Sequence, residues 1–283
     1  MPRIVSFLPA ATEIVYALGV GDELVGRSHE CDYPADARRL PIVSRPSLGL
    51  DGLTSGAIDE AVAGRLASGA SLYEIDERLL EELKPDVVLT QDLCQVCAPS
   101  GNELGRALRE LTHAPDVLWL TPKSLADVKK NILDVGDAVG RGSAAHALVQ
   151  SIDERLDRVA HAVLHAPRRR VAFLEWTDPP YCAGHWVPEM ISIAGGDDAF
   201  GRPGGDSVRI AWDAIVASRP EVVIVAPCGY GLEDATRLAS TLPVIPGATM
   251  HAVDANAYFA RPGPRVAEGT ELLARLFHAA CII

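Results

Sequence analysis

The sequence contains no run of roughly 18 apolar residues, the length that a helix needs to cross a membrane. It is also poor in basic residues, since 26 Lys and Arg stand against 38 Asp and Glu and the formal net charge is −12. A negatively charged protein is repelled by phosphate backbones and by anionic lipids. We therefore expect no membrane insertion and no nucleic-acid partner.

The start of the chain lacks the pattern of a signal peptide. "MPRIVSFLPAATEIV" has one Arg and a short apolar run, without the charged, apolar and small-residue segments in succession. The sequence as it stands therefore predicts a cytoplasmic protein, whereas a chain trimmed to its mature start would be periplasmic. In a reducing compartment its six cysteines would be thiols or ligands before they were disulfides.

Two groups of catalytic motifs are missing as well. The glycine-rich stretches "GVGDELVG" and "GRPGGDS" do not fit Gly-x-Gly-x-x-Gly between a strand and a helix, which disfavours dinucleotide binding. The eight histidines show no spacing that would place a Ser/His/Asp set. We expect a binding protein and not an enzyme, with no catalytic cofactor.

What is present is an alternation of apolar, β-rich runs and helical patterns. Such alternation is typical of parallel βαβ units with helices on both faces of a sheet. In the first part of the chain we expect strands at 3–8, 23–28, 41–45, 86–90 and 116–121, and helices at 9–19, 75–85 and 100–111.

The second half of the chain repeats this order. Residues 170–176 match 3–8, residues 190–201 match 16–26, and residues 214–229 match 78–94, where "KPDVV" and "RPEVV" differ only conservatively. The repeat predicts an α/β fold with two similar lobes, and we expect a ligand cleft between them.

A helical segment separates the two halves. Apolar residues step by three and four through 123–166, with a break at Gly140–Gly142. We expect an N-terminal lobe at 1–122, the helical segment at 123–166 and a C-terminal lobe at 167–283. The helix at 143–166 would join the lobes as a rigid strut and limit their motion.

The loops after the strands carry the unusual residues, and in open parallel sheets ligands bind beyond the carboxyl ends of the strands. Five of the six cysteines and most Tyr and Trp residues fall there, while Cys281 is expected to pack in the terminal helix. The loops expected to line the ligand cleft are 29–34, 91–97, 177–187, 227–231 and 256–263.

The Cys-x-x-Cys pair in "QDLCQVCAPSG" has three interpretations. A structural zinc normally takes two close pairs, and Cys31, Cys182 and Cys228 are single and scattered. A redox dithiol would sit at a helix N-terminus, and Cys97 does precede a predicted helix. Small residues that tolerate burial beside a ligand are the favoured interpretation. A thiol-based metal-handling or redox protein using Cys94 and Cys97 stays an alternative.

Several motifs together resemble the vitamin B12-binding proteins of ABC importers, within the substrate-binding proteins that carry a helical backbone between their lobes. The resemblance covers essentially the whole chain and rests on "SFLPAATEIVYALG", "CDYP", "KPDVVL", "DPPYCAGHWVPEM" with "AGGDDAFG", and "YFARPGPR". It implies two Rossmann-like lobes, a rigid helix between them and cobalamin or a related corrinoid as bound ligand. Haem or a ferric siderophore is the alternative, because relatives of this fold bind both.

The resemblance also implies particular residues. Tyr33 and Arg261 match positions that touch the corrinoid, and Glu77 and Asp213 match acids that dock onto an ABC permease. Well-known members place tryptophans where this chain has Pro46 or Ser47, Gln91 and Ser207, so other aromatic residues must form the walls. His185 could also reach the cobalt through its imidazole. The complete predicted ligand-binding set is Cys31, Tyr33, Tyr73, Asp92, Trp176, His185, Trp186, Tyr230, Tyr258 and Arg261.

Overall fold

The computed structural model describes residues 1–50, 52–68, 70–92, 101–109 and 111–278, with the backbone alone for 101–103. The chain divides into two compact units. Unit 1 comprises Met1–Thr121 and Lys129–Val149, and unit 2 comprises Pro122–Val128 and Gln150–Ile283.

Unit 1 is built on a sheet in which six of the described strands lie in the order β4-β3-β2-β1-β5-β6. β4 runs antiparallel to β3, and the other pairings are parallel. The central strands are buried on both faces, as covered parallel strands are. The strands are β1 (Ile4–Ser6), β2 (Leu24–Ser28), β3 (Ile42–Pro46), β4 (Tyr73–Ile75), β5 (Val87–Thr90) and β6 (Asp116–Trp119).

The core on one face of this sheet joins Val5, Val43 and Val88 to Leu80 of α3 and Leu104 of α4. Capping side chains set where helices begin, since Thr54 accepts a bond from the first turn of α2 and Asp76 does so for α3. The helices of this part of the chain are α1 (Pro9–Ala17), η1 (Gly21–Glu23), η2 (Ala35–Arg39), α2 (Ser55–Ala67), α3 (Glu77–Leu83) and α4 (Gly101–Arg109).

Unit 2 contains the second sheet, in the order β11-β10-β7-β8, with β9 also paired to β7. β8 is antiparallel to the end of β7, and the pairings of β7 with β9 and β10 are parallel. The strands are β7 (Arg169–Thr177), β8 (Pro180–Cys182), β9 (Gly196–Asp198), β10 (Val222–Val225) and β11 (Thr249–Ala252); the helices are α7 (Val187–Ile193), α8 (Trp212–Ala217), α9 (Leu232–Ala239), α10 (Ala255–Tyr258) and α11 (Val266–Phe277).

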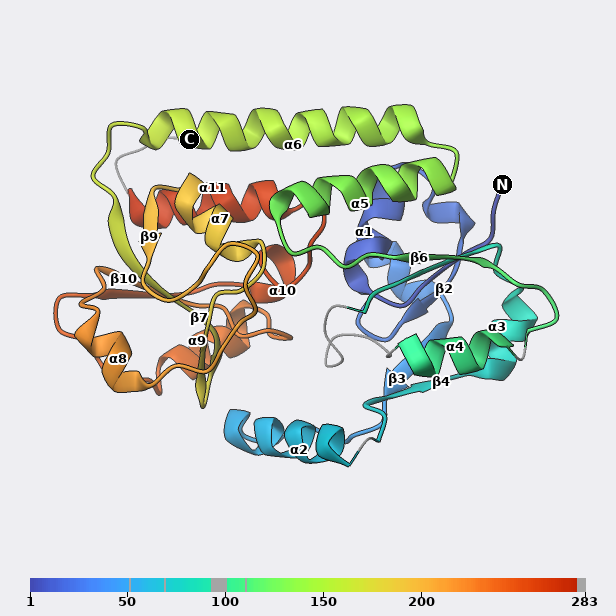
Figure 1. Ribbon diagram of the computed structural model, residues 1–283, viewed down its shortest axis with the longest axis horizontal. Coiled ribbons are helices and arrows are strands. Elements are labelled where there is room, and N and C mark those ends of the chain that lie inside the picture. Colours follow the sequence, from blue (N-terminus) through green and yellow to red (C-terminus); the bar gives the residue numbers. More distant parts are fainter. Residues whose placement is uncertain (51, 69, 93–100, 110, 279–283) are drawn as a thin grey trace. The chain divides into compact units, whose positions relative to one another are not determined.

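Helices α5 (Leu125–Ala138) and α6 (Gly142–Val163) each contribute residues to both units. The expected break between them is present, because Gly140 adopts a φ of +69° that L side chains rarely take. The predicted apolar faces are buried, with Ile132 and Val135 on α5 and Ile152 and Val159 on α6. α6 runs for 22 residues without interruption (Figure 1).

The mixed α/β fold with two sheets, expected from the sequence, is confirmed. The strands begin and end within a few residues of the predicted positions. The antiparallel strands β4 and β8 and helix α2 were not among the predicted elements. The predicted lobe boundaries and the cleft between the lobes stay predictions. None of the described helices is long and apolar enough to cross a membrane.

Candidate ligand-binding loops

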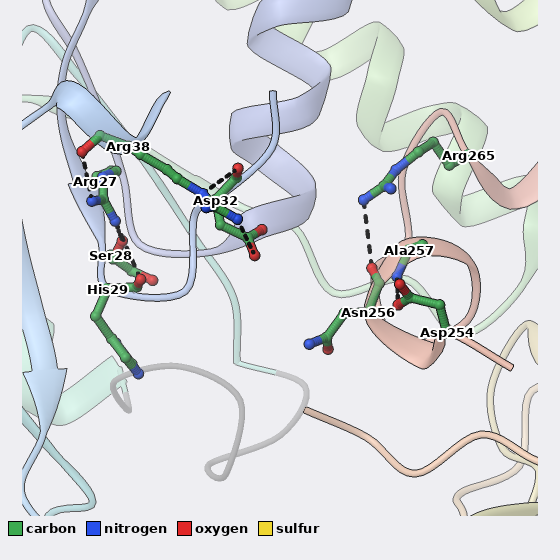
Figure 2. Close-up of polar contacts among 9 residues, drawn as sticks. All are labelled: Arg27, Ser28, His29, Asp32, Arg38, Asp254, Asn256, Ala257 and Arg265. Atoms are coloured by element: carbon green, nitrogen blue, oxygen red, sulfur yellow. Dashed lines mark hydrogen bonds and ion pairs between the residues drawn. The ribbon is translucent and has the colours of Figure 1, made fainter. Parts of the chain in front are cut away.

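In unit 1 the loop that follows β2 is held in shape by a buried arginine. Arg27 is 7% exposed, and its guanidinium donates to the carbonyls of Ser28 (2.9 Å), His29 (3.2 Å) and Arg38 (3.0 Å) (Figure 2). Three backbone acceptors are thereby satisfied by one charged donor, which makes strong hydrogen bonds. Sequence reasoning missed Arg27, although a charged residue inside an otherwise apolar strand was a visible signal.

A second arginine supports the tip of this loop. Arg38 donates through Nε to the Asp32 carbonyl (3.1 Å), and its Nη2 lies 3.7 Å from Asp32 Oδ2 (Figure 2). Cys31 is fully buried, with its Sγ 3.7 Å from Ser28 Oγ. Tyr33 is 49% exposed. The loop therefore presents Tyr33 to solvent and turns Cys31 into the protein.

His29 and Tyr73 lie beside each other near the same edge of the sheet, with ring centroids 6.1 Å apart. Burial lowers the pKa of His29, which keeps the imidazole neutral near pH 7. Tyr73 and Glu77 line one pocket of unit 1, so the structure brings a predicted ligand contact and a predicted docking acid together. Asp92 is exposed just beyond β5. Cys94 and Cys97 lie outside the described residues.

In unit 2 an aromatic pair stands at the carboxyl ends of β7 and β10. The rings of Trp176 and Tyr230 are 5.7 Å apart, and Trp176 Nε1 donates to the Asp178 carbonyl (3.1 Å). Both residues are half-buried. Burial raises the pKa of Tyr230, so its hydroxyl stays protonated. Cys228, in the loop between β10 and α9, is exposed.

His185 is fixed by a neighbouring loop. It has a φ of +54°, its backbone N–H donates to the Gly205 carbonyl (2.6 Å), and its Nε2 lies 3.5 Å from Asp206 Oδ1. Asp206 also lies 3.7 Å from Lys123 Nζ. Burial lowers the pKa of His185 and favours the neutral imidazole, the form that binds metals. Sequence reasoning did not anticipate Asp206 as its partner.

The remaining predicted contacts of unit 2 lie deeper. Trp186 is 6% exposed and donates through Nε1 to the Phe259 carbonyl (3.1 Å), and Arg261 is 7% exposed. Tyr258 is half-buried, at the end of α10. Asp254 caps α10 by accepting from the Ala257 N–H (2.7 Å), and Figure 2 shows this cap beside the contact from Arg265 to Asn256. These bonds fix the backbone from which Tyr258 and Arg261 extend.

The two predicted docking acids occupy similar positions in their units. Glu77 is the first residue of α3 and Asp213 lies in the first turn of α8. Both are exposed. Acidic side chains are favourable at helix N-termini because of the helix dipole, so these positions have a structural role as well. The part of the chain that the structure describes holds no group of three His, Cys, Asp or Glu that could bind a metal ion.

A family model and several known proteins match this chain. The family model of the periplasmic binding proteins matches residues 4–242. The vitamin B12-binding protein of Vibrio vulnificus is 24% identical over 228 residues, which cover 80% of this chain and 71% of the relative.

Two solved structures share the fold. One is the periplasmic vitamin B12 binding protein of Vibrio cholerae, with a TM-score of 0.69 and 21% identity over 99% of this chain and 97% of that one. The other is a periplasmic heme-binding protein from Roseiflexus sp. RS-1, with a TM-score of 0.71 and 21% identity over 99% of both chains. The resemblance inferred from the sequence is thereby confirmed. The chain belongs to the periplasmic binding protein family, whose members are substrate-binding proteins.

Proposed function

We propose that this protein binds cobalamin or a related corrinoid and does not act on it chemically. The observation that carries the proposal is the placement of aromatic side chains at the carboxyl ends of the strands, with Tyr33 in unit 1 and the Trp176–Tyr230 pair in unit 2. The similarity to vitamin B12-binding proteins supports this choice of ligand.

The proposed ligand is a broad, mostly apolar disc with amide arms and a phosphate-bearing tail. Such a ligand needs flat apolar walls and a few convergent donors. Each of the aromatic residues above can bury on the order of 150–250 Å² if it is fully enclosed. Arg261 adds a planar fork of donors that suits amide oxygens or a phosphate. His185 is the candidate ligand to cobalt.

A haem is the second candidate, because a solved neighbour is named a heme-binding protein. Corrinoid and haem are both flat metal chelates, so the same aromatic walls suit either ligand. They differ in their periphery, since haem carries carboxylates and a corrinoid carries amides. A ferric siderophore complex is the third candidate ligand.

The test is the visible absorption that the protein retains after incubation with cobalamin, haemin or a ferric siderophore and removal of free ligand. Saturable retention of cobalamin, and weaker retention of the other two, is the expected result. Tyr33→Ala should lower cobalamin affinity. Tyr16→Ala is the matched control, because Tyr16 lies near the end of α1, away from the carboxyl end of β1 where that helix begins. Retention of haemin alone would replace the corrinoid by haem.

The wider role we propose is that of the substrate-binding protein of an ABC importer, or of a cytoplasmic relative of one. Glu77 and Asp213 are the acids that would dock onto the permease. Replacing Asp213 by Ala should leave cobalamin affinity unchanged and should weaken association with permease vesicles. Loss of ligand affinity in Asp213→Ala would contradict a docking role for this residue.

A further inference from the structure

A polar pocket of about 380 Å³ lies in unit 1, beside the edge strand β4. Its walls come from elements far apart in the sequence: the end of β3, the last turn of α2, β4, the start of α3, and α4. A recess of this volume suits a small molecule or one chemical group of a larger ligand. The side chains that decide what it can hold are Ser47, Arg65, Ser71, Glu74, Glu77 and Arg106.

Arg65 is held in the pocket wall by neutral partners. Its Nε donates to the Ser71 carbonyl (2.8 Å) and its Nη2 donates to Ser47 Oγ (3.3 Å). Ser47 Oγ in turn donates to the same Ser71 carbonyl (2.7 Å). Both of these partners are neutral oxygens, and they fix the half-buried guanidinium in place through two of its five N–H donors.

The second guanidinium of the pocket is only loosely engaged. Arg106 Nε lies 3.9 Å from Glu77 Oε1, and the two side chains are 71% and 44% exposed. An exposed pair of this length contributes little to stability, so Arg106 can turn toward an anion at small cost. Glu74 also lines the pocket and is exposed. Its negative charge repels an anion in the pocket. Removing that charge should therefore strengthen anion binding, whereas removing the charge of Arg65 should weaken it.

We propose that this pocket is an oxyanion subsite that takes a phosphate or carboxylate group through Arg65, assisted by Arg106. A guanidinium binds such groups with two parallel N–H donors, and these charge-assisted bonds are about twice as strong as neutral ones. The group can belong to a free small molecule or to the phosphate-bearing tail of a corrinoid. Only the second source rests on the proposed function.

The experiment is a calorimetric titration of the full chain with inorganic phosphate, and in parallel with acetate. The wild type should show saturable binding of at least one of them. Arg65→Gln should weaken that binding about tenfold or more, and Glu74→Gln should strengthen it, because a repelling charge is removed. Arg78→Gln is the matched control on α3, since Arg78 is 89% exposed, pairs with Glu82 and does not line the pocket.

Two results would overturn the proposal: no saturable binding of either anion by the wild type, or equal affinity in the wild type and Arg65→Gln. If Arg65→Gln does not fold, Arg65→Lys and the gain expected for Glu74→Gln keep the test decisive. Absence of that gain in a folded Glu74→Gln protein would likewise count against the site.

Cobalamin distinguishes the two sources of the anion. If the corrinoid tail occupies the pocket, Arg65→Gln weakens cobalamin as well as phosphate, and phosphate competes with cobalamin in the wild type. If a separate small molecule occupies it, only phosphate or acetate affinity falls. If the protein binds no cobalamin at all, the proposed function is contradicted. The anion titration would still test the pocket independently.

Discussion

The same pair of hydrogen bonds recurs at the amino-terminal edges of the two sheets. In unit 1 the Arg3 N–H donates to Asp86 Oδ2 (2.7 Å), and the Asp86 N–H donates back to the Arg3 carbonyl (2.8 Å). In unit 2 the Arg170 N–H donates to Glu221 Oε2 (3.1 Å), and the Glu221 N–H donates to the Arg170 carbonyl (2.8 Å). In both units an acid that follows a proline thus fastens two neighbouring parallel strands.

The carboxyl-terminal edges of the two sheets are built differently. In unit 1, β1 ends at Ser6 and the loop after β2 is built around Arg27. In unit 2, β7 continues to Thr177, turns back as β8, and β8 is bonded to residues 207–210. The amino-terminal edge therefore joins neighbouring strands in the same way in both units, whereas the carboxyl-terminal edge has its own structure in each unit. We therefore propose that ligand specificity resides in the carboxyl-terminal edges of the sheets.

The largest expected effect tests the unit 1 loop. Arg27→Ala leaves the carbonyls of Ser28, His29 and Arg38 without their charged donor, and should lower the free energy of unfolding by about 3 kcal/mol. Arg45→Ala is the control, because Arg45 is exposed on the neighbouring strand β3. Urea denaturation measures both variants. Equal costs would mean that Arg27 does not hold the loop.

The next effect concerns the ligand contact of unit 2. Arg261→Ala should weaken cobalamin binding by about 2 kcal/mol, or roughly thirtyfold, if Arg261 makes a charge-assisted bond to the ligand. Arg237→Ala on α9 is the control, since Arg237 is exposed and pairs with Asp234. Equilibrium dialysis gives the affinities. An unchanged affinity in a folded Arg261→Ala protein would remove this residue from the site.

A smaller effect tests whether the amino edges are equivalent. Asp86→Ala and Glu221→Ala should each lower the free energy of unfolding by about 1 kcal/mol, and the two losses should add, because the residues belong to separate units. A cost confined to one variant would break the similarity of the two edges.

Acid should weaken the Glu221 contact in a predictable window. The Arg170 backbone N–H holds the pKa of Glu221 below its usual value of 4.5, so the folded state binds fewer protons there than the unfolded chain. This contribution is complete above about pH 4.5 and is lost as the pH falls through the lower folded pKa. Glu221→Gln should therefore flatten the acid side of the stability profile.

The smallest effect concerns two residues in matching positions before a proline. Lys84 has a φ of +44° and Arg219 a φ of +49°, in the left-handed region that favours glycine. Lys84→Gly and Arg219→Gly should each raise stability by about 0.5 kcal/mol, because relief of this strain exceeds the entropy that glycine adds to the unfolded chain. Thermal melting measures the stability of both variants. A loss in both variants would show that the side chains matter more than the backbone.

The difference between the amino-terminal and carboxyl-terminal edges also explains which features could be predicted from the sequence. "KPDVV" and "RPEVV" predict helix ends and strand starts because local chemistry decides them: a proline stops the helix and a buried valine run forms the strand. The helical segment follows from the periodic spacing of its apolar residues, and the repeat follows from three matching segments in the same order. Helix α2 escaped prediction because its apolar residues are weakly segregated, and Ser55 is its one buried residue.

Loop geometry depends on partners distant in sequence, which no local pattern encodes. Trp186 was expected to form part of a wall, and it is buried, with its Nε1 bonded to Phe259 73 residues away. Arg27, Arg38 and Asp206 position the loops through bonds to carbonyls or through ion pairs that depend on the folded chain path. The predicted site residues stay predictions, and the structure now gives their exposure and neighbours.

Hydrogen exchange with and without cobalamin tests the central claim most directly, because it reads both edges in one measurement. The account predicts slower exchange on ligand addition in the carboxyl-edge loops 29–34, 177–187, 227–231 and 256–263. It predicts unchanged exchange at the amino edge, in residues 112–115 before β6 and 164–168 before β7. Protection confined to the amino edge, or no protection at a saturating concentration of cobalamin, would contradict it.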